Sequence, residues 1–259
     1  MPKHGVIISD LHCGHRFGLC PPQHWEREGG DDRQEKIRQW QAATWEWYTA
    51  KAREIGHIDR LIINGDAIEG DGIRSGATEL YTSNRLEQAK VAEQCARQFD
   101  FNEATVIEGT ASHTGTAEHY EDPLAEALGT HLQVHAWLEY AGCCMDLKHH
   151  IGTSSTPGAV PPALPREAIW NLMWGEHNLQ PKANVFIRSH GHGYFAIIED
   201  DFIAMITPSL QGFTNYGGTR MSKTISYGFI EFWISDEGVF TWQRHRLIPT
   251  FAAAKAESI

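Results

Sequence analysis

The stretch GVIISDLH, residues 5–12, begins with an apolar run and ends with an Asp and a His. Its β-branched residues, Val6, Ile7 and Ile8, favour a buried strand. Asp10 and His12 stand two positions apart, so they leave an extended chain on the same side and can bind the same metal ion. The stretch therefore predicts a first strand that carries metal-binding side chains at its carboxyl end.

Similar residues follow four later strand-like runs. These are LIIN (61–64) before Gly65-Asp66, TVIE (105–108) before Gly109-Thr110-Ala111-Ser112-His113, MDLK (145–148) before His149-His150, and VFIRS (185–189) before His190-Gly191-His192. In α/β sheets the loops that leave the carboxyl ends of strands meet at one edge, so we expect a single site. A lone His is more often structural than a ligand, but that explanation does not account for five strand ends in succession.

Strand-like runs alternate with helical stretches in the first half of the chain, where helices are expected over about 33–54 and 85–99. This order favours a layered α/β fold. Later we expect strands at 132–135 and 142–148, a helix from about 165 to 176, and a mostly antiparallel C-terminal third. No internal repeat or linker divides the sequence, so we expect one domain over residues 1–259.

The chain has 259 residues, with 22 Lys or Arg against 33 Asp or Glu, which gives a formal net charge of −11. This balance excludes a protein that coats nucleic acid or anionic membrane, while a local nucleic-acid site stays open. No apolar run approaches the roughly 20 residues that span a bilayer. Five Cys and the lack of a signal peptide before the first strand predict free thiols and a cytoplasmic location.

The order Asp-x-His, Gly-Asp, Gly-to-His, His and His-Gly-His over residues 5–192 resembles the calcineurin-like metallophosphoesterase superfamily. The segment DLHCGHRFGLCPP (10–22) is similar to small members from phages and bacteria. The resemblance implies a four-layer α/β/β/α sandwich with mixed sheets. It also implies that phosphate esters, diesters in preference to monoesters, are hydrolysed by a hydroxide that bridges two metal ions.

The resemblance also assigns a role to each motif residue. It places Asp10, His12 and His192 on the first metal, Asp66 between both metals, and His190 with His149 or His150 on the second. We interpret His149 as the ligand and His150 as a residue that faces the substrate or supports a ligand. The resemblance implies that His113 is the catalytic residue, which contacts the phosphate and assists the leaving group, and we interpret Glu69 as a residue that supports a ligand. The two ions are divalent transition metals, and the sequence does not choose among Mn, Fe, Zn, Co and Ni.

The third motif departs from the pattern of the superfamily, which is Gly-Asn-His with Asn as a ligand of the second metal. Here Thr110-Ala111-Ser112 stands between Gly109 and His113, and there is no Asn. Thr110 or Ser112 could supply a weaker oxygen, His113 could bind the metal itself, or a water could fill the position. The sequence leaves these alternatives open.

The sequence indicates the substrate-binding residues less clearly than the metal ligands. Arg74 and Arg220 lie in predicted loops that could overhang the site and bind phosphate, although a single Arg in a loop is more often an exposed surface charge. The Pro-rich loop 152–165 could form a lid or an oligomer contact, and the oligomeric state is not predicted.

The expected partner is a small phosphate ester or a nucleotide, and a short nucleic acid is also compatible. Two alternatives remain beside a phosphodiesterase. One is a DNA or RNA nuclease of the same superfamily, and the other is a binding protein that has kept the fold and lost most of its turnover.

Overall fold

The computed structural model describes residues 1–24, 32–72, 76–115, 119–152, 163–214 and 225–248, and two sheets run through these segments. The first sheet has the strand order β11-β10-β1-β2-β3-β4. Its first four strands along the chain are mutually parallel, β10 pairs antiparallel with β1, and β11 pairs antiparallel with β10. The strands are β1 (Lys3–Ile8), β2 (His57–Asn64), β3 (Asp100–Ile107), β4 (Leu132–Gln133), β10 (Gly228–Ile234) and β11 (Phe240–Arg246).

The second sheet has the strand order β5-β6-β7-β9-β8. Its central strands β6, β7 and β9 are parallel, while β5 and β8 pair antiparallel at the two edges. The strands are β5 (Ala136–Tyr140), β6 (Cys143–Leu147), β7 (Val185–Arg188), β8 (Phe195–Ile198) and β9 (Ile203–Ile206). Both sheets are therefore mixed, as predicted.

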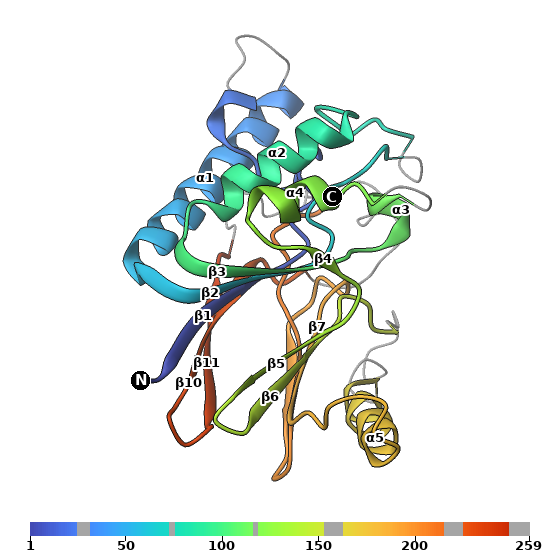
Figure 1. Cartoon of the computed structure of the whole chain (residues 1–259). Helices are drawn as coiled ribbons and strands as arrows, with labels where there is room; N and C mark the ends of the chain where they lie inside the picture. Colours follow the sequence, from blue (N-terminus) through green and yellow to red (C-terminus); the bar gives the residue numbers. More distant parts are fainter. Residues whose placement is uncertain (25–31, 73–75, 116–118, 153–162, 215–224, 249–259) are drawn as a thin grey trace, which may run out of the picture.

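Helices cover the outer faces of the sheet pair (Figure 1). α1 (Asp32–Ile55), α2 (Arg85–Ala96) and α4 (Asp122–Ala127) lie over the first sheet, and α5 (Ala163–Glu176) lies beside the second. A 3₁₀ turn (Pro22–His24) and the short helix α3 (Ala111–Thr114) complete the described elements. The sequence-based prediction of a four-layer α/β/β/α sandwich is confirmed.

The apolar core follows these layers. Val6 and Ile8 of β1 face the helices, where Tyr48 of α1 is also buried, whereas Ile7 points into the space between the sheets. This alternation is the period of two that a strand imposes on its side chains. A third, smaller cluster around Leu164 lies between α5 and the second sheet. The core thus holds both sheets in place beneath the loops that carry the motifs.

Most predicted elements are present, with two corrections. The strand β5 and the short helices α3 and α4 were not predicted, because each has six residues or fewer and shows no clear period. The C-terminal third is less antiparallel than expected, since β7 is parallel to β9. The reason is that β8 forms the sheet edge and its hairpin partner β9 returns next to β7.

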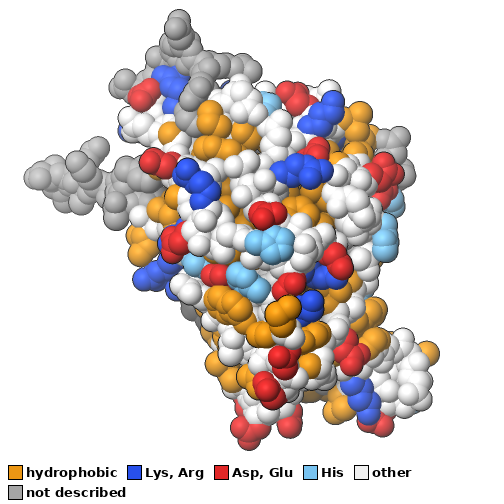
Figure 2. Space-filling view, turned by 60° about the vertical axis from the view of Figure 1, so that its left-hand side comes forward, with side chains coloured by type: hydrophobic (Ala, Val, Ile, Leu, Met, Phe, Trp, Pro, Cys, Tyr) orange, Lys and Arg blue, Asp and Glu red, His pale blue; other side chains and the backbone are white. Residues whose placement is uncertain are grey.

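All five cysteines are buried and free. Among the described residues, no helix is both long and apolar enough to cross a membrane. On the face shown in Figure 2, acidic and basic side chains are interspersed and form no continuous basic area.

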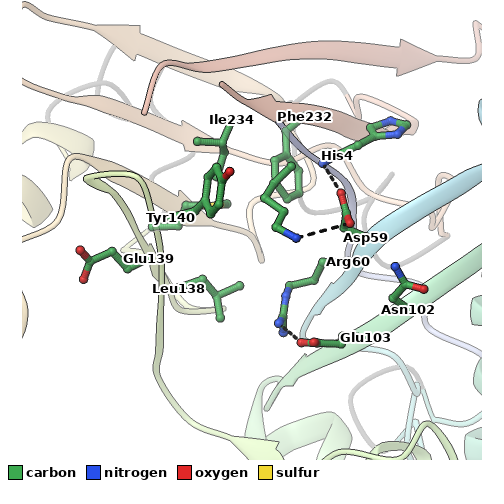
Figure 3. Close-up of a pocket in the computed structure, with 12 residues that line it drawn as sticks. His4, Asp59, Arg60, Asn102, Glu103, Leu138, Glu139, Tyr140, Phe232 and Ile234 are labelled. Carbon is green, nitrogen blue, oxygen red and sulfur yellow. Dashed lines mark hydrogen bonds and ion pairs between the residues drawn. The ribbon is translucent and has the colours of Figure 1, made fainter. Parts of the chain in front are cut away.

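A cavity of ≈190 Å³ opens between the sheets at the amino-terminal end of β1, away from the motif loops. Its apolar wall includes Leu138 and Phe232. At its rim Lys3 pairs with Asp59 and Arg60 pairs with Glu103 (Figure 3). Because both of these cations are already paired with carboxylates, this cavity does not match the phosphate chemistry that the sequence predicts.

Candidate metal centre

The predicted motifs come together beyond the carboxyl ends of β1, β2, β3, β6 and β7. The loops after β1 and β2 stay hydrogen-bonded past the strands, since the Asp10 N–H donates to the Gly65 carbonyl and the His12 N–H donates to the Asp66 carbonyl, both at 3.0 Å. The topology of two packed sheets therefore gathers side chains that are up to 182 positions apart, from Asp10 to His192.

The backbone at this centre is strained in a consistent way. Among the described residues, eight other than glycine have positive φ, and five of these are predicted metal ligands: Asp10 (50°), His12 (47°), Asp66 (49°), His190 (64°) and His192 (50°). A left-handed conformation costs a residue with a side chain about 1–2 kcal/mol. Strain of this kind clusters where a site needs side chains aimed at a common point.

The first group of side chains is Asp10, His12 and His192. Nε2 of His192 lies 3.2 Å from Asp10 Oδ1 and 3.3 Å from Nε2 of His12. Both oxygens of Asp10 are buried and neither has a hydrogen-bond donor in the described structure. A buried carboxylate without donors is costly unless a cation balances it, so this group fits a metal ion.

The second group is Asp66, His149 and His190. Asp66 Oδ2 lies 2.9 Å from Nε2 of His149 and 3.7 Å from Nδ1 of His190. The same oxygen is 4.0 Å from Nε2 of His12, a member of the first group. Asp66 therefore lies between the two groups, where a carboxylate can bridge two cations.

The adjacent residues His149 and His150 lie in different surroundings. His149 is buried, and its Nδ1 donates to the Asn64 carbonyl at 2.7 Å, which directs Nε2 toward Asp66. His150 is exposed and its ring lies 4.8 Å from the ring of His190. The geometry thus places His149 in the second group and His150 beside it.

Thr110, which follows Gly109 in the third motif, contacts the second group. Its Oγ1 lies 3.2 Å from Asp66 Oδ2 and 3.1 Å from Nδ1 of His190. Its backbone N–H donates to Asp66 Oδ1 at 2.5 Å. Ser112, the other predicted hydroxyl, has a buried Oγ without a hydrogen-bond partner in the described structure. Of the two hydroxyls, Thr110 is the one in contact with the second group.

Glu69 and His113 support the first group from one side. Glu69 Oε2 accepts from Nδ1 of His12 at 2.7 Å, which leaves Nε2 of His12 as the metal-binding nitrogen. Nδ1 of His113 donates to the Glu69 carbonyl at 2.8 Å, and the His113 ring lies 4.7 Å from the His12 ring. Gln211, which the sequence did not single out, donates to Glu69 Oε2 at 3.3 Å.

The charges at the centre suit cation binding. Burial raises the pKa of Asp66, but His149, His190 and His113 together outweigh burial and hold this pKa well below its ordinary value. Burial also raises the pKa of Glu69, but the hydrogen bond and charge of His12, with smaller effects of His15 and His113, lower it to about 2. These carboxylates are therefore charged at neutral pH, which is the form that binds metal.

The donor set decides which cations fit. Imidazole nitrogens and carboxylate oxygens suit Mn, Fe, Co, Ni or Zn better than Mg or Ca, which prefer oxygen ligands alone. Three donor groups of the described residues satisfy the spacing for a metal ion, and the third consists of His12, Glu69 and His113. His12 and Glu69 are already hydrogen-bonded to each other, so the first two groups are the better ligand sets.

No protein-family model and no curated protein sequence matches the chain. Solved structures give distant likenesses. A single mutant of Vps29 from Entamoeba histolytica is 13% identical over 96% of this chain and 100% of that one, with a TM-score of 0.45. A predicted phosphoesterase from Streptococcus pneumoniae is 12% identical over 96% and 95%, with a TM-score of 0.42. Wild-type Vps29 from E. histolytica, solved with Zn²⁺, is 13% identical over 95% and 99%, with a TM-score of 0.45.

The fold is of the calcineurin-like metallophosphoesterase type. This assignment rests on the four layers, the order of the strands and the five strand-end motifs of the chain itself, rather than on the distant likenesses. It concerns the fold and leaves the activity open.

Two predicted substrate residues, Arg74 and Arg220, lie outside the described residues. The same holds for 153–162, the main part of the predicted lid or oligomer loop 152–165. Their predicted roles are therefore not tested.

Glu121 is a residue of the centre that the sequence did not reveal. It is fully buried, and its two oxygens accept from the backbone N–H groups of Ala67 at 2.7 Å and Gly109 at 2.8 Å. Ala67 follows Asp66 and Gly109 precedes Thr110, so one carboxylate joins the second and third motif loops. Burial, followed by the charge of Asp66, raises the pKa of Glu121 to about 7.

We expect Glu121→Gln to loosen this connection. Gln presents one oxygen and one NH₂ group, so one of the two buried N–H groups loses its acceptor, which lowers the free energy of unfolding by about 1–3 kcal/mol. Metal affinity should fall about 10–100-fold, as it does when a residue that orients ligands is changed. Urea denaturation and metal titration measure the two effects. Glu126→Gln on the exposed side of α4 is the matched control, and equal behaviour of both variants would contradict the role of Glu121.

Proposed function

We propose that the chain is a phosphoesterase that uses two divalent metal ions and prefers phosphodiesters to monoesters. The observation that carries this proposal is the position of Asp66, a buried carboxylate between two groups of metal-binding side chains. A single metal site would not need a shared carboxylate between two histidine-containing groups.

In this proposal Asp10, His12 and His192 hold one cation, His149 and His190 hold the other, and Asp66 contacts both. When bound, the pair of cations activates a water for in-line attack on phosphorus and neutralises the charge that develops on the phosphate oxygens. Other protein groups orient the metal-binding histidines. Glu69 orients His12, and the Asn64 carbonyl orients His149. His113 protonates the leaving group from the side of Glu69.

The preference for diesters has a local electrostatic reason. Within the described part of the chain, the ion-pair partners of Asp10 and Asp66 are all histidines. No Arg or Lys is therefore paired at these ligands to neutralise the second charge of a monoester, whereas a diester carries only one. We expect kcat/KM for an aryl phosphodiester to exceed that for the matched monoester about tenfold or more. A monoester that is hydrolysed equally well would remove this part of the proposal.

Thr110 makes the second metal the weaker one. A neutral hydroxyl is a poorer ligand than the amide oxygen of Asn, so one ion should dissociate first on dialysis. Thr110→Asn should then tighten the second site, by about tenfold, and Thr110→Val should weaken it. Calorimetric titration with Mn²⁺ measures both. The wild-type protein could instead bind two metals with equal affinity, and Thr110→Asn could leave both affinities unchanged. That result would show that a residue other than Thr110 is the ligand of the second metal at this position.

The proposal as a whole is tested with Mn-loaded protein and a panel of aryl monoesters, aryl diesters, cyclic nucleotides, and single- and double-stranded nucleic acid. Hydrolysis of small diesters that exceeds cleavage of nucleic acid supports the proposal, and the reverse result favours the nuclease alternative. Two bound metals without hydrolysis of any substrate would favour a binding protein. The predicted cytoplasmic location and the single domain over residues 1–259 remain proposals.

A further inference from the structure

The outermost helix, α5, has its residue types arranged in an unusual way. Apart from Leu164, which packs in the cluster against the second sheet, the buried residues of α5 are small or polar: Ala163, Asn171 and Gly175. The other large apolar side chains point outward and are half exposed: Ile169 (57%), Trp170 (55%), Leu172 (56%), Met173 (50%) and Trp174 (49%). An amphipathic helix at the surface of a monomer normally shows the opposite arrangement.

The exposed apolar area on the outward side of α5 is larger than scattered apolar residues on a monomer surface would give. Five side chains that each expose about half of roughly 200 Å² form an apolar patch on the order of 500 Å², near the upper end for a monomer. Two of the five are Trp, a residue type that is enriched at the centres of interfaces. The patch therefore points to a partner surface.

The helix is also held rigidly. Glu167 accepts from the buried Arg188 side chain of β7 at 2.7 and 3.0 Å. Asn171 donates to the Pro181 carbonyl at 2.9 Å and accepts from the Ala183 N–H at 2.8 Å. Polar contacts thus fix the inner side of α5, so the apolar outer side is presented in one orientation.

The charges on this face select a second copy of the chain as the partner. Arg166, Ile169, Met173 and Glu176 are spaced by three, four and three residues, so they form one stripe along α5. If two copies of α5 pair antiparallel about a two-fold axis, each Arg166 lies opposite Glu176 of the other copy and each Ile169 lies opposite Met173. In the described structure Arg166 is exposed and makes no ion pair, whereas Glu176 pairs through Oε1 with the exposed Lys182 at 2.6 Å. Arg166 of the other copy would therefore approach a carboxylate that already has one cation, and such exposed pairs contribute little.

We propose that α5 is the interface of a two-fold symmetric homodimer with antiparallel α5 helices. Two patches of this size bury on the order of 1,000 Å² in total, which is near the lower limit for a specific interface. The dimer is consequently weak enough to depend on protein concentration. None of the six proposed metal ligands belongs to α5, so the dimer does not rest on the proposed phosphoesterase activity.

The test is sedimentation of the full chain over a concentration series. The wild-type protein should shift from monomer to dimer, and Met173→Glu should raise the dimer dissociation constant by roughly tenfold or more. Val239→Glu is the matched control, because Val239 is equally exposed (57%) in the turn between β10 and β11 and should leave the dimer unchanged.

A charge exchange tests the antiparallel pairing without changing the apolar residues. Arg166→Glu should weaken the dimer. Glu176→Arg, combined with Lys182→Glu so that position 176 keeps its partner within the chain, should also weaken it, and Arg166→Glu added to this pair should restore it. Far-UV circular dichroism checks that each exposed variant is folded. A wild-type chain that stays monomeric up to about 100 µM, well above the range of a micromolar dimer, would overturn the proposal. Binding of monomers to phospholipid vesicles through α5, or a triple variant that fails to restore the dimer, would overturn it as well.

Discussion

Asp66→Ala is expected to abolish turnover and to remove most of the bound metal. Asp66 Oδ2 lies within 4.0 Å of imidazole nitrogens from both groups, so this carboxylate is the one described ligand that reaches both proposed cations. Its removal disturbs two metal sites at once, and we expect kcat/KM to fall on the order of 10³-fold or more. Metal content after dialysis should fall from two ions per chain to less than one.

The control for this variant is Asp100→Ala. Asp100 is an exposed carboxylate at the start of β3, at the end of the strand opposite the motif loops, where it pairs only with His57 among the described residues. It should keep two metals and full activity. An Asp66→Ala protein that keeps two metals and near-normal turnover would show that Asp66 does not bridge them.

His113→Asn should lower kcat on the order of 10²–10³-fold while both metals stay bound, which is typical of the loss of a general acid. Nδ1 of His113 donates to the Glu69 carbonyl, so a proton for the leaving group has to come from Nε2. Asn cannot carry out this proton transfer, and the six proposed ligands are untouched.

The effect of His113→Asn should depend on the leaving group. An aryl diester with a very acidic leaving group needs little protonation, so the loss should be smaller for this substrate than for an alkyl diester. Loss of one metal in this variant would instead identify His113 as a ligand, in keeping with its place near His12 and Glu69. Equal losses for both leaving groups, with both metals bound, would contradict the role of general acid.

The fold could be predicted from sequence because β1, β2 and β3 contain apolar runs that are buried on both faces. In runs such as Ile62-Ile63 this pattern can be recognised from the local sequence alone. The strand β5 was missed because its sequence AWLEY includes Glu139 and lies at a sheet edge. Whether a short edge strand forms depends more on the strand that it pairs with than on its own residues.

The candidate site could be predicted only in part, for a related reason. Asp and His at strand ends are visible in the sequence, and the resemblance favoured His149 over His150. The hydrogen bond of His149 to the Asn64 carbonyl, which distinguishes the two, is not visible there. Glu121 lies in a polar stretch without any motif, and its role appears only when two loops meet its carboxylate. Contacts of this kind are set by tertiary packing.

The most direct measurement of the central claim is anomalous diffraction from crystals of the Mn-loaded protein. We predict two anomalous peaks roughly 3.5–4 Å apart, the spacing of two-metal sites. One peak should contact Asp10, His12 and His192, the other should contact His149 and His190, and Asp66 should touch both. Crystals without a peak at the strand-end loops, or with a metal ion that leaves Asp66 without a metal contact, would contradict the account.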